Sequence, residues 1–246
     1  MRRFIVPNLS VTDGSATVDG DAYRHMATVL RLGSGDRVIL ADGAGREYLG
    51  TILETTSGAI IVQLEEQAAA ADSDAAPRIT LYQGLPKPDK LELILQKATE
   101  LGVSRIVAFP AERSVTKLDR ERGADRVRRW QKIVLEAARQ SNRTSVPEVR
   151  LAGGLKEVLA EPPGDINLML WEEESDVRLR DILATAAVPR RVSVIVGPEG
   201  GLSRNEAAAA GLAGFATVSL GKRILRTETA SLALLAIVQH CWGDLG

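Results

Sequence analysis

The sequence predicts two parts of different fold class: a small β-barrel with one helix, then an α/β domain built on a largely parallel sheet. One observation is the polar, alanine-rich stretch from Glu65 to Pro77, which has no hydrophobic periodicity and is typical of a linker. The other is that short β-forming runs precede this stretch, whereas strands alternating with helices follow it. We therefore place the two domains at residues 1–72 and 73–246.

The first part contains five short runs of β-forming residues and one helical segment. Turn signals such as Asp13-Gly14 separate the runs. Tyr23, Met26 and Leu30 recur at helical spacing, which predicts a helix over about Asp21 to Leu32. The expected strands are Arg3–Val6, Ala16–Val18, Arg37–Ala41, Tyr48–Leu53 and Ala59–Leu64.

The second part alternates apolar strands with helices that carry recognisable end signals. A helix is expected to begin at Asp89 as N-cap, with Glu92 at the capping-box position, and to end at Gly102. Ser203 and Glu206 form a second expected capping box. The other expected elements are a basic helix over about Glu121 to Ser141, a last helix over Glu228–Trp242, and the strands Ile79–Leu85, Val103–Phe109, Ile166–Trp171, Val192–Val196 and Ala216–Leu220.

Composition excludes several classes of protein. The 246 residues are 45% apolar and 26% charged with a net charge of −1, the balance of an ordinary soluble domain. No apolar run reaches the ~20 residues that span a bilayer, and the first residues lack a signal-peptide core, so we expect a cytoplasmic protein. The single Cys241, expected to be buried, excludes an internal disulfide or a cysteine-based zinc cluster. Two distant histidines argue against a histidine metal site, and no metal is expected.

Positive charge is concentrated in one stretch of the second part. Arg113–Arg143 contains 10 basic and 4 acidic residues, whereas the first 72 residues contain 6 basic and 10 acidic ones. The stretch is either a solvated helix face with local ion pairs or a stripe that binds RNA phosphates. Composition alone leaves both interpretations open.

Three polar or glycine-rich segments follow strands, where an α/β sheet presents its ligand-binding loops. They are Leu170–Glu174, Gly197–Ser203 and Leu220–Ala230. The glycine pair of the second permits close backbone approach to a ligand, and a tight turn before a helix explains it equally well. In the third, Thr227 is expected to cap the last helix, while Arg226 could position a phosphate or a base. Dinucleotide and P-loop fingerprints do not occur.

Five motifs in order carry a resemblance to a known family. They are Lys90 followed by Gln96–Val103, then Arg113–Val115, Glu136–Arg143 with Pro147, Gly197–Gly201 and Leu220–Ala230. Each is weak alone. Together, and with His25 to Asp36 in the first part, they strongly resemble the RsmE family of SPOUT-class methyltransferases. One departure is Asn142, which stands where that family frequently has glycine.

The resemblance implies a PUA-like RNA-binding barrel followed by an α/β SPOUT domain whose C-terminal part forms a deep trefoil knot around S-adenosylmethionine. It implies methyl transfer from this cofactor to N3 of a uridine in the decoding region of 16S rRNA, on assembled small ribosomal subunits. It further implies a homodimer whose active sites lie at the subunit interface. No membrane is expected as a partner.

The resemblance also assigns roles to individual residues. Glu199, Arg226 and Thr229 are implied to face the methyl group or the uridine, with Glu199 as candidate base or as a residue that orients the loop, and Arg226 stabilising charge on the uracil oxygens. The implied cofactor-binding residues are Leu170, Trp171, Glu172, Gly197, Pro198, Glu199, Gly200, Gly201, Leu220, Gly221, Arg223, Ile224 and Leu225. The implied RNA-binding residues are Arg2, Arg3, Arg24, Arg31, Arg113, Arg139, Asn142 and Arg143.

Two other functions stay open at this point. A non-catalytic RNA-binding protein of ribosome assembly would use the barrel and the basic stripe, but it has no need of the segments 197–201 and 220–230. A SPOUT methyltransferase that acts on transfer RNA or on a ribose hydroxyl would share the fold and the cofactor and differ in its substrate. Both alternatives are distinguished by which RNA, if any, receives a methyl group.

Overall fold

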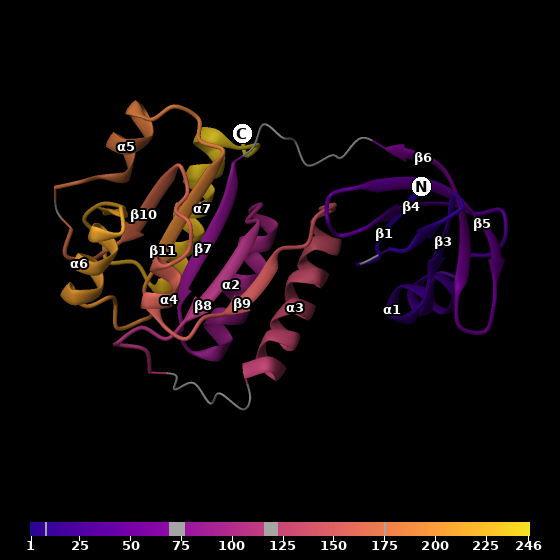
Figure 1. The fold of residues 1–246 in the computed structure, drawn as a ribbon, viewed down its shortest axis with the longest axis horizontal. Coiled ribbons are helices and arrows are strands. Elements are labelled where there is room, and N and C mark those ends of the chain that lie inside the picture. The colour runs from indigo at the N-terminus through magenta and orange to yellow at the C-terminus, as the bar shows by residue number, and fades with distance from the viewer. Residues whose placement is uncertain (8, 69–76, 116–122, 175) are drawn as a thin grey trace. The chain divides into compact units, whose positions relative to one another are not determined.

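The computed structural model describes residues 1–7, 9–68, 77–115, 123–174 and 176–246 (Figure 1). The chain forms two compact units, of which the first comprises Met1–Ser73 and Ala138–Val146 and the second Asp74–Ala137 and Pro147–Gly246. Most of the expected linker and the expected boundary between residues 72 and 73 lie outside the described residues. The first unit therefore includes a short segment from the second half of the sequence.

The first unit is a six-stranded sheet with one helical segment. Its strands are β1 (Arg2–Ile5), β2 (Val11–Thr12), β3 (Ser15–Val18), β4 (Arg37–Ala41), β5 (Glu47–Thr55) and β6 (Ile60–Ala68), in the order β1-β4-β5-β6-β3-β2. β1 and β4 are parallel, and the other neighbours are antiparallel. Alternating side chains, among them Val18, Leu40 and Ile60, are fully buried with Met26 of the helical segment. The five expected strands thus correspond to β1 and β3–β6.

The helix expected over Asp21 to Leu32 is shorter and less regular than its spacing predicts. One α turn, α1 (Gly20–Tyr23), continues as a π-helix, η1 (Arg24–Val29), and the Leu30 N–H donates to the His25 carbonyl at 3.0 Å. Arg31 then adopts a φ of 54°, which ends the helix. Hydrophobic spacing reports the buried face but not the hydrogen-bonding pattern, so it could not distinguish these two kinds of turn.

The second unit is a six-stranded parallel sheet with helices in the connections (Figure 1). The strands are β7 (Arg78–Gly84), β8 (Arg105–Phe109), β9 (Glu148–Leu151), β10 (Ile166–Leu170), β11 (Arg191–Val196) and β12 (Ala216–Val218), in the order β12-β10-β11-β7-β8-β9. The helices are α2 (Pro88–Glu100), α3 (Gly123–Gln140), α4 (Leu155–Leu159), α5 (Leu179–Thr185), α6 (Arg204–Leu212) and α7 (Thr227–Trp242). All strand pairs are parallel, as the alternation predicts.

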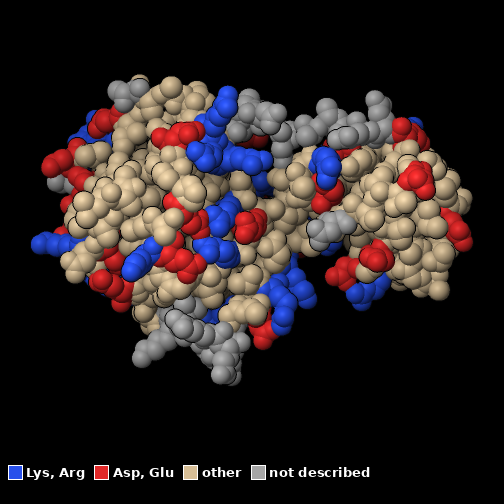
Figure 2. Space-filling model, in the orientation of Figure 1, with Lys and Arg blue, Asp and Glu red and all other residues tan. Residues whose placement is uncertain are grey.

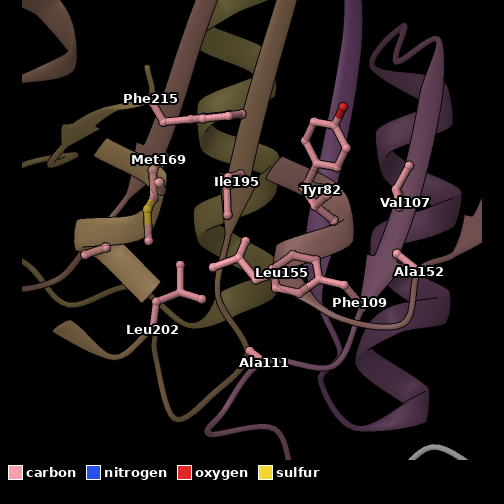
Figure 3. Close-up of a cluster of buried hydrophobic side chains, with 13 residues drawn as sticks. Tyr82, Val107, Phe109, Ala111, Ala152, Leu155, Met169, Ile195, Leu202 and Phe215 are labelled. Carbon is pink, nitrogen blue, oxygen red and sulfur yellow. The ribbon is translucent and has the colours of Figure 1, made fainter. Parts of the chain in front are cut away.

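A hydrophobic cluster packs against one face of this sheet. Tyr82, Phe109, Met169 and Ile195 come from four neighbouring strands and pack with Phe215, which precedes β12 (Figure 3). The strands are buried on both faces because helices occupy the crossovers, which explains their nearly continuous apolar runs. The packed sheet fixes the strand ends from which the functional loops emerge.

Several local expectations need correction. Pro88 is the first residue of α2, so Lys87 is the N-cap and Asp89 lies in the first turn. α7 begins at Thr227, so Arg226, not Thr227, is its N-cap. Cys241 is exposed because the buried face of α7 carries other side chains, including Leu234, Leu235, Val238 and Trp242. The capping box of Ser203 and Glu206 is confirmed.

Candidate active site

Loops that follow neighbouring parallel strands meet at the carboxyl edge of the second-unit sheet. The residues after β10, β11 and β12 are the three segments that the sequence analysis singled out, and residues after β7 and β8 join them. The Trp171 N–H donates to the Val218 carbonyl at 3.2 Å, and Arg113 Nη1 donates to the Gly200 carbonyl at 3.3 Å. Arg113 also lies 3.7 Å from a carboxylate oxygen of Glu172. Arg113 therefore connects the first two predicted segments.

The glycines of the loop Gly197–Gly201 are required by close neighbours. A Cβ atom on Gly200 would lie 2.9 Å from the Arg113 Cβ and carbonyl oxygen. Gly201 has a φ of 70°, and a Cβ atom there would collide with the carboxylate of Glu172. A Cβ atom on Gly84, at the end of β7, would lie 2.7 Å from Pro198 Cδ. The loop is thus fixed from three sides by segments distant in sequence.

A buried polar network connects this loop to α7. The Thr227 hydroxyl donates to the Gly197 carbonyl at 2.6 Å and accepts a hydrogen bond from Gln83 Nε2 at 3.1 Å. The Ser231 hydroxyl donates to Gln83 Oε1 at 2.6 Å. Gln83 and Ser231 are fully buried, where an unsatisfied polar group is costly. Sequence reasoning missed Gln83 and Ser231, although a glutamine at the end of an otherwise apolar strand is an available signal.

Glu199, in the loop Gly197–Gly201, contacts residues at the start of α2. Its Oε1 accepts a hydrogen bond from the Lys87 N–H at 3.1 Å and lies 3.7 Å from Lys90 Nζ. Lys90 Nζ is also 3.2 Å from Glu228 Oε2, in the first turn of α7. The carboxylate is therefore held by α2, and this contact supports an orienting role for Glu199 as well as a chemical one. Lys90 joins the residues of interest, although the sequence analysis assigned it no role.

Arg226 and Thr229 lie exposed where α7 begins. As the N-cap residue, Arg226 accepts a hydrogen bond from the Ala230 N–H through its backbone carbonyl at 2.8 Å. Its guanidinium forms no ion pair with the described residues and is therefore available to a ligand. Gly221 has a φ of 111°, Arg223 and Ile224 are exposed, and Leu220 and Leu225 are half-buried. Within the described chain, the N–H groups of residues 220–226 donate no hydrogen bonds. This run of free backbone donors suits a ligand with several polar atoms.

The expected RNA-binding residues divide between the two units. Arg113 belongs to the second unit, where it contacts the loop Gly197–Gly201, and the other seven belong to the first unit. Arg3 pairs with Glu47 at 2.5 Å and donates to the Asn142 carbonyl at 2.7 Å. Asn142 has a φ of 57°, which explains why glycine suits this position and why asparagine is tolerated there.

The remaining expected RNA-binding residues have varied surroundings. Arg2 and Arg31 are exposed, and Arg24 is exposed and pairs with Asp21. Arg139 donates to the Ile5 carbonyl at 3.5 Å, and Arg143 donates to the Ser145 hydroxyl at 3.1 Å. On the face shown in Figure 2, positive and negative side chains are interspersed. Arg2 and Arg31, which are exposed, are therefore the members of this set most available to a phosphate.

The part of the chain that the structure describes offers neither a membrane-spanning helix nor a cluster of metal-binding side chains. No helix there is long and apolar enough to cross a membrane. Within the same residues, no group of three or more histidine, cysteine, aspartate or glutamate side chains is placed to hold a metal ion.

The fold and the edge loops define an RNA methyltransferase with an N-terminal PUA domain. The family model described as "RNA methyltransferase domain" matches residues 74–239, and that described as "RNA methyltransferase PUA domain" matches residues 18–65. The chain is 34% identical to the ribosomal RNA small subunit methyltransferase E of Mycobacterium tuberculosis, over 96% of this chain and 90% of that protein. The corresponding Bacillus subtilis protein is 32% identical over 91% and 89%. The chain belongs to the ribosomal RNA small subunit methyltransferase E family.

Solved structures agree with this assignment. The structure of a ribosomal RNA small subunit methyltransferase E from Neisseria gonorrhoeae bound to S-adenosylmethionine has a TM-score of 0.82 and 33% identity, covering 99% of both chains. A Legionella pneumophila structure, described as a methyltransferase in complex with the same cofactor, has a TM-score of 0.84 and 30% identity, covering 99% of this chain and 98% of that one. The second unit therefore has the SPOUT methyltransferase fold, preceded by a PUA-like domain.

Proposed function

We propose that this protein transfers the methyl group of S-adenosylmethionine to N3 of a uridine in the decoding region of 16S rRNA, on assembled small ribosomal subunits. The observation that carries the proposal is the carboxyl edge of the sheet, where glycine-shaped loops and the free N–H groups of residues 220–226 converge. Membership of the small-subunit methyltransferase family supports the substrate class.

The same edge supports binding of the cofactor. The residues proposed to surround it are the thirteen from Leu170–Glu172, Gly197–Gly201, Leu220, Gly221 and Arg223–Leu225 that the sequence analysis named. Among them, the backbone N–H groups of Leu220, Gly221 and Arg223–Leu225 are free to donate to a carboxylate or to ring nitrogens, as the methionine and adenine parts require. When bound, S-adenosylmethionine supplies an electrophilic methyl group. Relatives crystallised with this cofactor support the assignment.

The chemistry needs a proton acceptor and a stabiliser of negative charge. Uracil N3 carries a proton, so its lone pair becomes available only as that proton leaves. Glu199 is the proposed acceptor, because the Lys87 N–H holds one carboxylate oxygen at 3.1 Å, and the second oxygen accepts no hydrogen bond from the described residues. The free guanidinium of Arg226 is proposed to stabilise charge on the uracil oxygens, and Thr229 lies one helical turn away.

The remaining assignments follow from the same proposal. The first unit, with Arg2, Arg3, Arg24, Arg31, Arg139, Asn142 and Arg143, is proposed to bind RNA, together with Arg113 of the second unit. We propose domains at residues 1–72 and 73–246, a cytoplasmic location beside the ribosomes, and a homodimer with active sites at the subunit interface. We also propose that the C-terminal segment forms a trefoil knot, as the SPOUT fold implies.

The test is transfer of labelled methyl from S-adenosylmethionine to small subunits that lack the modification. Naked 16S rRNA and bulk transfer RNA run beside them, and the products are digested to nucleosides. Label in 3-methyluridine from small subunits alone is the expected result. Label in transfer RNA or in a ribose-methylated nucleoside contradicts the proposed substrate. Absence of both label and cofactor binding supports a non-catalytic protein of ribosome assembly instead.

A further inference from the structure

Lys90 is placed between the two carboxylates nearest the proposed reaction. It is the third residue of α2, and its Nζ lies 3.7 Å from Glu199 Oε1 and 3.2 Å from Glu228 Oε2. The side chains of Lys90 and Glu199 are each 22% exposed, and that of Glu228 is 15% exposed. We call these three residues the site cluster. Its charges are mostly screened from water, so their interaction is stronger than that of a surface pair.

The site cluster contains one positive and two negative charges. Glu228 Oε2 is enclosed by protein and accepts no hydrogen bond from the described residues, so the Lys90 ammonium supplies its nearest compensating charge. Glu199 also has the Lys87 N–H as a partner. Without Lys90, two carboxylates from different segments would face each other without a cation, and like charges repel.

These two carboxylates belong to the segments that must be held together. Glu199 lies in the loop Gly197–Gly201, and Glu228 follows the Arg226 N-cap by two residues in the first turn of α7. Their common partner belongs to α2, which packs against α7. We propose that Lys90 is a positioning residue for methyl transfer, which ties the Glu199 loop to the start of α7 and so fixes the proposed proton acceptor relative to Arg226. The inference rests on the proposed function.

The test compares Lys90→Met with Lys90→Arg in the full-length protein. Lys97→Met is the matched control, because Lys97 lies on the same helix and pairs with Glu100 at 2.9 Å, away from the site cluster. We expect Lys90→Met to lower kcat on small subunits about 10- to 100-fold through misplacement of reacting groups. The Kd for S-adenosylmethionine should stay within about threefold, the sign that the lost interaction acts in the reaction step. Lys90→Arg should restore most of the rate.

A double variant separates repulsion from simple loss of a contact. Lys90→Met combined with Glu228→Gln removes the cation together with one of the facing carboxylates, so we expect part of the lost rate to return. A wild-type kcat in both Lys90→Met and Lys97→Met overturns the inference about Lys90 and leaves the proposed function standing. The inference is also overturned if Lys90→Met lowers kcat, cofactor affinity and the unfolding midpoint together, because such a general loss indicates a merely structural residue. If the wild-type protein methylates no RNA, the proposed function fails and this inference fails with it.

Discussion

Two clusters of charged side chains in the second unit are built in opposite ways. In one, which we call the sheet cluster, Glu161 accepts hydrogen bonds from Tyr82 at 2.9 Å and from Arg105 Nη1 at 2.5 Å, and it also pairs with Arg150. Arg150 in turn pairs with Glu157 at 2.6 Å. In the site cluster, a single ammonium serves two carboxylates at 3.2 and 3.7 Å.

The difference indicates which cluster is structural. In the sheet cluster the short, charge-assisted hydrogen bonds satisfy the carboxylate and join β7, β8, β9 and the end of α4. Burial alone would raise the pKa of Glu161, but hydrogen bonds from Arg105 and Tyr82 outweigh it and hold that pKa below its ordinary range. The site cluster has longer contacts, and its single ammonium faces two carboxylates. Charged groups that lack a full set of hydrogen-bonding and ion-pair partners are expected at functional sites.

The largest expected effect comes from the backbone beneath the site. Gly201→Ala forces a side chain into the left-handed region at a φ of 70° and places its Cβ against the Glu172 carboxylate. We expect the loop to move and the Kd for S-adenosylmethionine to rise about 100-fold, a loss of about 2.7 kcal/mol of binding free energy. Isothermal titration calorimetry measures this affinity.

Gly214→Ala is the matched control for strain. Gly214 has a φ of 86°, and nothing lies within 4 Å of an added Cβ atom. It should lower the free energy of unfolding by about 1 kcal/mol through backbone strain and leave cofactor affinity unchanged. Similar affinities in the two variants would show that the contact with Glu172 is unimportant.

The next largest expected effect is on the free energy of unfolding and concerns the sheet cluster. Glu161→Gln leaves two arginines without their shared charge, and we expect a loss of about 2 kcal/mol in the free energy of unfolding, with wild-type methyl transfer. Because the folded-state pKa of Glu161 lies below the ordinary 4.5, its stabilisation is present above pH 4.5 and is lost as pH falls below that value. The free energies of unfolding of the wild-type protein and of Glu161→Gln, measured with urea, should therefore become equal in acid.

Glu157→Gln is the control for this prediction, because the Glu157 side chain is more exposed than that of Glu161. Its side chain is 48% exposed and pairs with Arg150 alone among the described arginines, so its effect on stability should be smaller. Loss of methyl transfer in Glu161→Gln with unchanged stability would reverse the roles that we assign to the two clusters.

The smallest effect concerns the tyrosine of the sheet cluster. Burial, followed by the hydrogen bond to the Glu161 carboxylate, raises the pKa of Tyr82 to about 12. The protonated phenol is thus favoured in the folded state, and its contribution is present below pH 10 and lost as pH rises from 10 to about 12. Tyr82→Phe should cost about 1 kcal/mol at neutral pH and remove this alkaline step in unfolding experiments. Retention of the step would assign it to another group.

Sequence patterns predicted the elements whose signals are local. The Ser203–Glu206 capping box needs four consecutive residues, and the segment Val192–Val196 is apolar except for Ser193, so both were readable. β9 was missed because only Val149 of its four residues is buried, which leaves little hydrophobic pattern. The Thr227 hydroxyl was expected to cap α7, yet it bonds to Gly197, thirty residues earlier. A tertiary partner of this kind leaves no trace in local propensity.

The site was predictable as three segments but not as a set of contacts. The order of strands in a parallel sheet decides which loops become neighbours. β7, which carries Gln83, lies between β8 and β11, although β11 comes much later in the sequence. The pairing of Lys90 with both Glu199 and Glu228 depends on α2 packing against α7. Residues that join distant segments were therefore found only in the structure.

The most direct test of the difference between the clusters is the single-turnover rate of Glu199→Gln on small ribosomal subunits. Glutamine keeps the shape and can still accept the Lys87 N–H, but it cannot take a proton from uracil N3. We predict a rate about 100-fold lower, with the Kd for S-adenosylmethionine and the unfolding midpoint unchanged. A wild-type rate with unchanged cofactor affinity would contradict the role of Glu199 as base and leave it as a residue that orients the loop.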